Sequence, residues 1–292
     1  SKTDRDAIQS EIDQLTTEID RVAETTKFNE TYLLKGDADG ATKDVYMKGH
    51  DAGLKGELTD GATKATFKVA AGALDAGKSV TIGGKEYTIG ATVAEAKKIA
   101  DGAQKDAKIT IDGTTYTVAD DDTGAADNKL TLATIQGKVV GGSTIEYNGK
   151  SVRAINDTKT TGVDDADSSI ITAAKAVELM TAELTTANNI GATKTAATIA
   201  AGTTYASATG ATFNITKGTA EVAEKLNFNL HVGSDADMTN KINVNIETMS
   251  SSYLGIKGLN VSDDTGVSAT YAVDAIADAL QKVSDQRSSL GA

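Results

Sequence analysis

Two stretches of aliphatic residues at heptad spacing, one near each end of the 292-residue chain, most constrain what this protein can fold into. Intervals of three and four residues place such side chains on one narrow stripe of an α-helix. We predict an N-terminal helix capped by Thr3, with Asp6 completing the cap, and a C-terminal helix that ends near Gly291. The ten predicted stripe residues are Ile8, Ile12, Leu15, Ile19, Val22, Val273, Ile276, Leu280, Val283 and Leu290.

Neither helix is expected to be stable alone. Burial contributes about 1.5–3 kcal/mol for each aliphatic side chain, whereas ordering the backbone costs about 1–2 kcal/mol per residue. Each stripe therefore needs a partner, and the simplest partner is the other stripe, so that the two ends form a helical stem. Two separate helices packed on one globular core are the alternative. Asp13, Glu18 and Asp20 fall off the stripe and are expected to be solvated.

The middle of the chain has a different composition, rich in Gly, Thr, Ala and Asp. The segment 80–89 matches 109–118 position by position, and a weaker copy covers 145–152. Each copy contains a two-residue turn signal, which predicts a tight β-hairpin. Short helices are expected at 93–100 and 169–184, and further strands at 212–216, 226–232 and 242–246.

These patterns predict an α+β protein with a discontinuous helical stem and an inserted β-rich head of hairpin-plus-helix units. The predicted ranges are 1–36 and 226–292 for the stem with a β-hairpin, 37–78 and 190–225 for an inner head domain, and 79–189 for an outer head domain.

Composition excludes several classes of function. The chain has no Cys, which excludes disulfides, thiolate zinc sites and cysteine nucleophiles. Its formal net charge of −12 disfavours binding to nucleic acid. No apolar run approaches the roughly 18 residues of a membrane span, and no secretory signal is visible. Because the sequence starts at Ser1 rather than Met, we expect the natural N-terminus to lie upstream.

Motifs for catalysis or cofactors are weak. Residues 72–79 fit the phosphate-binding pattern GxxxxGK[ST], but that mechanism requires a helix at Lys78, and a strand is predicted there. His50 and His231 are the only histidines, and neither lies in a metalloprotease motif. The Asp clusters at 37–39 and 120–122 lack calcium-loop spacing. We therefore predict no enzyme activity, no cofactor and no metal.

The two ends resemble bacterial flagellins. The stretch 18–34 is similar to the N-terminal pattern EIDR[IV]A..T.FNG..LL, and 242–249, 254–259 and 283–292 are similar to the C-terminal pattern. Glu30 departs from the pattern, which usually has Gly there, and is expected to tighten the turn after Asn29.

This resemblance implies a structural subunit of the flagellar filament, exported through the flagellar channel and extracellular, whose partners are other flagellin subunits. It also implies helices before Ser1 and after Ala292, without which the isolated chain should be monomeric. Recognition by the innate immune Toll-like receptor for flagellin is a further implication. Its possible contact surface is Ile8, Gln9, Glu11, Asp13 and Leu15, although seam packing is the simpler role for Ile8 and Leu15. A hook–filament junction protein and a coiled-coil-stalked surface adhesin are the alternatives.

Overall fold

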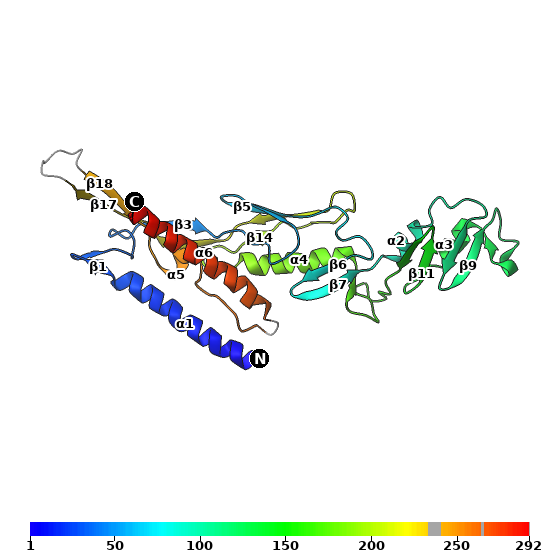
Figure 1. Cartoon of the computed structure of the whole chain (residues 1–292), viewed down its shortest axis with the longest axis horizontal. Helices are drawn as coiled ribbons and strands as arrows, with labels where there is room; N and C mark the ends of the chain where they lie inside the picture. Colours follow the sequence, from blue (N-terminus) through cyan, green and yellow to red (C-terminus); the bar gives the residue numbers. More distant parts are fainter. Residues whose placement is uncertain (233–240, 264–265, 292) are drawn as a thin grey trace.

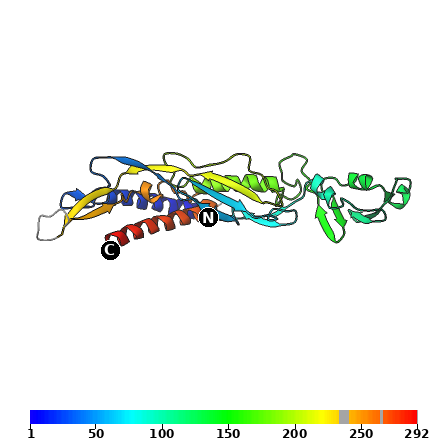
Figure 2. The ribbon, with the colours of Figure 1, turned by 90° about the horizontal axis from the view of Figure 1, so that it is seen from above.

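The computed structural model describes residues 1–232, 241–263 and 266–291, and it shows an elongated molecule (Figure 1). The helices from both chain ends lie in one half of its length, and a small β-rich body forms the opposite tip (Figure 2). The chain is therefore a mixed α+β protein, as predicted. None of the helices among the described residues combines the length and apolar character needed to cross a membrane.

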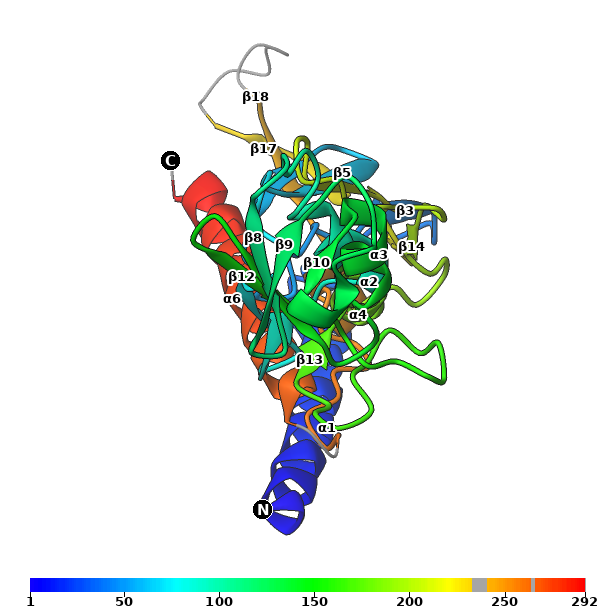
Figure 3. The same cartoon turned by 90° about the vertical axis from the view of Figure 1, so that its right-hand side faces the viewer.

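The helical half contains α1 (Lys2–Thr25), α5 (Ser251–Leu254) and α6 (Val267–Leu290). Figure 3 looks along the molecule from its β-rich tip and shows α1 and α6 as separate helices. The predicted cap at Thr3 is wrong: helix α1 begins two residues earlier, because Ser1 and Asp4 form the reciprocal capping box.

Two hairpins accompany these helices. One joins β1 (Lys27–Phe28) to β2 (Thr31–Tyr32), and the other joins β17 (Leu226–His231) to β18 (Lys241–Ile246). Asn29 and Glu30, in the first turn, have φ of 48° and 66°. This left-handed conformation favours Asn and Gly over Glu, so Glu30 is strained there.

The middle of the molecule, which we call the inner unit, is built around a four-stranded antiparallel sheet, with helix α4 (Ala173–Asn188) beside it. The order of its strands is β14 (Thr198–Ile199), β15 (Ala211–Thr216), β5 (Lys64–Val69) and β4 (Glu57–Asp60). Its core includes Phe67 and Phe213, both fully buried, with ring centroids 6.0 Å apart. A second sheet has the order β13-β7-β6, and β3 pairs with β16. These further strands are β3 (Thr42–Tyr46), β6 (Ser79–Ile82), β7 (Lys85–Ile89), β13 (Ile170–Ile171) and β16 (Thr219–Ala223).

The outer unit, residues 91–154, carries a five-stranded sheet of order β10-β9-β8-β11-β12. Its own core includes Ile109, Ile135 and Ile145, which are all fully buried. The elements are α2 (Val93–Lys98), β8 (Lys108–Ile111), β9 (Thr114–Val118), the 3₁₀ helix η1 (Ala125–Asp127), β10 (Lys129–Leu130), α3 (Leu132–Gly137), β11 (Thr144–Tyr147) and β12 (Lys150–Arg153).

The three predicted repeat hairpins are confirmed as β6–β7, β8–β9 and β11–β12. Both residues of each turn have positive φ, for example 50° at Asp112 and 82° at Gly113, as a two-residue turn of this kind requires. The predicted helices also form, at α2 and α4. The predicted strand at 212–216 forms as β15, and those at 226–232 and 242–246 form as β17 and β18.

Hydrophobic clusters group the middle of the chain differently from the predicted ranges. One cluster gathers residues from 52–89 and 171–215 together with Tyr271, and it forms the core of the inner unit. The second contains only residues of 91–154. Hairpin β6–β7 and helix α4 therefore pack with the inner unit, although 79–189 was predicted to form the outer domain. The division into domains itself stays a prediction.

Candidate functional site

The apolar residues of α1 divide into two sets. Ile12 and Ile19 are half-buried and pack on a cluster that includes Leu254, Ile256 and Leu259. The other three stripe residues of α1 are exposed and follow one another at heptad spacing. They are Ile8, Leu15 and Val22, which are 51%, 56% and 40% exposed. Two of the five predicted stripe residues on α1 thus pack on the protein, whereas three are exposed.

Helix α6 buries a different stripe from the one predicted. Ala272, Ala275 and Ala279 are buried against the 254–261 segment, because alanine allows a close approach. Tyr271 is also buried, but it packs against the cluster of the inner unit. Of the five residues predicted to form the stripe on α6, four are exposed and Val283 is half-buried. The exposed four are Val273, Ile276, Leu280 and Leu290. The prediction that all these larger residues form a buried seam is therefore wrong for the single chain.

The two stripes border one open apolar groove instead of packing directly against each other. Helix α5 and the segment after it contact both α1 and α6, so they fill the space where direct pairing was predicted. The groove has a volume of about 410 Å³. Its lining residues are Glu18, Ile19, Val22, Ala23, Leu34, Met249, Leu254, Ile256, Ile276, Ala279, Leu280 and Val283.

Polar contacts fix α1 at the edge of this groove. Gln9 Nε2 donates to Leu259 O at 2.9 Å, and Val261 N donates to Gln9 Oε1 at 2.7 Å. The carboxylate of Asp20 accepts from Ser251 N at 2.7 Å and from Ser251 Oγ at 2.9 Å. Asp20 was predicted to be solvated, and this is wrong, because it caps the start of α5. Its partner Ser251 is fully buried and Asp20 is half-buried, so the contact is only partly open to water.

The predicted receptor-contact residues share the same helix but not the same surroundings. Ile8 and Leu15 are exposed, and so are Glu11 and Asp13. Gln9 is half-buried, and besides its backbone contacts it donates to Asp13 Oδ1 at 2.8 Å. Its amide therefore has an intramolecular role.

Helix α6 is anchored from several elements at once. Tyr271 donates a hydrogen bond to Glu183 of α4, and burial together with this carboxylate raises the pKa of Tyr271 far above its usual range. Lys48 Nζ lies 2.8 Å from Asp278 Oδ1. Lys282 Nζ donates to Tyr253 O at 2.6 Å, and burial lowers the pKa of Lys282. Gln286 receives a hydrogen bond from Glu247 N at 2.9 Å, which links α6 to hairpin β17–β18.

The other sequence motifs have structural explanations. Lys78 is followed by strand β6, and the amides of Gly77 and Lys78 donate to Ile89 O and Asp75 O, at 2.7 and 3.0 Å. These two amides are thus already occupied within the chain. His50 Nε2 lies 3.5 Å from Asp278 Oδ2, in the contact between the inner unit and α6. Within the described ranges, no group of three or more His, Asp or Glu side chains is arranged to hold a metal ion.

An open apolar groove flanked by heptad-spaced side chains is typical of a surface that packs against further helices. Residues 1–39 match the family model described as the bacterial flagellin N-terminal helical region. A flagellin of Clostridium tyrobutyricum is 60% identical over 38 residues, which cover 13% of this chain and 10% of that relative. The match thus spans about a tenth of the relative's length. Both findings support a flagellin over this short N-terminal stretch, and flagellins are structural proteins rather than enzymes.

Proposed function

We propose that the chain is a structural subunit of the bacterial flagellar filament that supports swimming motility, exported through the flagellar channel to an extracellular position. The observation that carries this proposal is the exposed groove between α1 and α6 within a chain whose first 39 residues match the flagellin N-terminal region. The stem, at 1–36 and 226–292, lies in the filament wall, and the β-rich units face solvent.

The apolar stripes supply the contacts that assembly needs. Ile8, Leu15 and Leu280 are each more than half exposed, and aliphatic side chains on one helix face are unfavourable in water. Apolar helices of neighbouring subunits cover the groove and both stripes. A head-to-tail contact whose rotation does not close generates a filament, and we propose a contact of this kind for the two stripes.

Immunogold electron microscopy of the encoding bacterium tests the proposal, with antibodies raised against this chain. Labelling along the whole filament is the expected result. Labelling confined to the base of the filament would identify a hook–filament junction protein instead. Cell-surface labelling away from any filament would identify an adhesin, and a strain lacking the gene serves as the control.

We also propose that the exposed face of α1 is recognised by the innate immune Toll-like receptor for flagellin. Support comes from the exposure of Ile8, Glu11, Asp13 and Leu15 on consecutive turns of one helix. Gln9 would act through another residue, because its amide holds Asp13 and the 259–261 backbone.

Reporter cells expressing this receptor provide the measurement. Exchanging Glu11→Lys inverts a charge within the proposed surface, and we expect potency to fall about tenfold, equivalent to about 1.4 kcal/mol. Glu24→Lys, an exposed charge inversion near the other end of α1, is the matched control and should keep full potency. Equal potency of the two variants, or no response to the unaltered chain, would refute receptor recognition without affecting the filament proposal.

A further inference from the structure

The chain passes between the inner and outer units at two adjacent points. It leaves after β7 through Gly90 and Ala91, and it returns after β12 through Ala154 and Ile155. Ala91 and Ala154 pair as an isolated parallel bridge, and Ile155 N donates to Ala91 O at 2.8 Å. On the inner side, Gly90 N donates to Ile171 O at 2.8 Å. Two short backbone segments therefore carry the connection.

The two cores end on opposite sides of this crossing. Ile89 belongs to the inner cluster, whereas Ala91 and Ala154 belong to the outer one. Strand β13 follows the third hairpin in sequence but pairs with β7 of the first hairpin. The outer unit is consequently inserted into the inner unit as one continuous segment with its own hydrophobic core.

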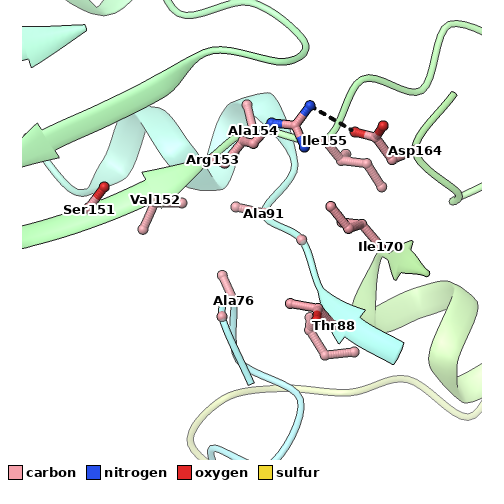
Figure 4. A pocket seen from close by; sticks show the side chains of 13 residues that line it. Ala76, Thr88, Ala91, Ser151, Val152, Arg153, Ala154, Ile155, Asp164 and Ile170 are labelled. Atoms are coloured by element: carbon pink, nitrogen blue, oxygen red, sulfur yellow. Dashed lines mark ion pairs between the residues drawn. The ribbon is translucent and has the colours of Figure 1, made fainter. Parts of the chain in front are cut away.

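Two cavities lie beside the crossing, where side chains do not fill the space between the two units. A cavity of about 130 Å³ lies between Thr88 and Ile170 of the inner unit and Ser151 and Val152 of the outer unit (Figure 4). A larger cleft of about 670 Å³ also borders Gly90, and its lining residues from the two units include Asp75, Thr172, Tyr205, Thr92 and Glu95. Close packing is what makes a protein interior resist deformation, and these two voids interrupt that packing beside the crossing.

One side-chain ion pair spans the crossing (Figure 4). The guanidinium of Arg153, the last residue of β12, lies 3.9 Å from Asp164 Oδ2. Asp164 is fully buried in the loop before β13, and it accepts hydrogen bonds from the backbone N–H groups of Asn156 at 2.9 Å, Ala166 at 2.9 Å and Asp167 at 3.1 Å. A carboxylate fixed in this way gives the more exposed Arg153 a defined point of attachment.

We propose that the crossing is a hinge on which the outer unit tilts relative to the inner unit, and that Arg153 and Asp164 form a latch that limits the tilt. Gly90 lets the backbone of the connection pass close to strand β13, since a Cβ there would lie 2.8 Å from Ile170 Cγ2. Small residues continue on the outer side, where Ala91 and Ala154 are fully buried. Movement of two cored bodies about a few connecting residues is how hinges work in other proteins.

Pulsed electron spin resonance tests the hinge directly, because the chain has no native cysteine that would compete for spin labels. Lys68→Cys on β5 and Thr114→Cys on β9 place exposed labels on the inner and outer units. The control pair, Lys68→Cys with Glu178→Cys on α4, lies within the inner unit. We expect the distance distribution between units to be about twice as wide as that of the control pair, as hinge motion requires. Equal widths would overturn the hinge.

The latch is tested in the same labelled chain. Arg153→Gln removes the charge but keeps a long polar side chain, so the distribution between units should widen further. Arg153→Lys retains the charge and should restore most of the original width. If Arg153→Gln leaves the width unchanged, the latch is wrong. Circular dichroism on each variant verifies that the fold is intact, so a change in width reports motion rather than unfolding.

Discussion

Replacing Phe213 with alanine should reduce the free energy of unfolding of the inner unit by about 3–5 kcal/mol, the usual loss for a large aromatic side chain removed from a core. Phe213 is fully buried on β15, between β14 and β5, and its ring packs beside that of Phe67 with the two planes tilted by 44°. Aromatic residues make up only 4% of the chain, so this pair has few substitutes. Denaturant titration followed by circular dichroism measures the change.

The control for this variant is Phe28→Ala, which removes the same side chain at a position that is 74% exposed. Its effect should remain within about 0.5 kcal/mol, as for most surface substitutions. Similar losses for Phe28→Ala and Phe213→Ala would contradict the assignment of the inner core.

Replacing Ile109 with alanine should destabilise the outer unit alone, by about 2–5 kcal/mol. Ile109 is fully buried on β8, and every residue of its cluster lies within 91–154. Because this core shares no residue with the inner cluster, we expect two separable unfolding transitions. Hydrogen exchange read by mass spectrometry should show loss of protection in peptides from 91–154, with β5 and β15 remaining protected.

Val140→Ala is the matched control in the same unit, since Val140 is 59% exposed. Its exchange pattern should equal that of the unaltered chain. A uniform loss of protection over the whole molecule in Ile109→Ala would mean that the two units unfold as one.

Local patterns in the sequence predicted the local structure well. Turn pairs such as Asp112-Gly113 determine hairpin geometry within a few residues, and heptad spacing indicates a helix regardless of what the helix packs against. The hairpins and both long helices could therefore be predicted from the sequence. The short N-terminal stretch that resembles flagellin is also the stretch that the family comparison supports.

Contacts between distant residues could not be predicted in the same way. The capping of Ser251 by Asp20 joins residues 231 positions apart, and no periodicity in either segment signals it. On α6, pattern analysis gave weight to Val273, Ile276 and Leu280, but the helix packs through Ala272, Ala275 and Ala279. A heptad pattern shows which side chains are stabilised by burial. It does not show which face is covered within the chain and which remains for other molecules.

The pairing of Ala91 with Ala154 has a consequence for how this protein can change over generations. A segment that departs from and returns to neighbouring points can be exchanged for another whose ends meet at the same spacing, and the remainder of the molecule need not adjust. The outer unit at the tip can therefore be replaced as a whole. Substitutions on its surface need not disturb α1 and α6, because the outer core shares no residue with the clusters that pack those helices.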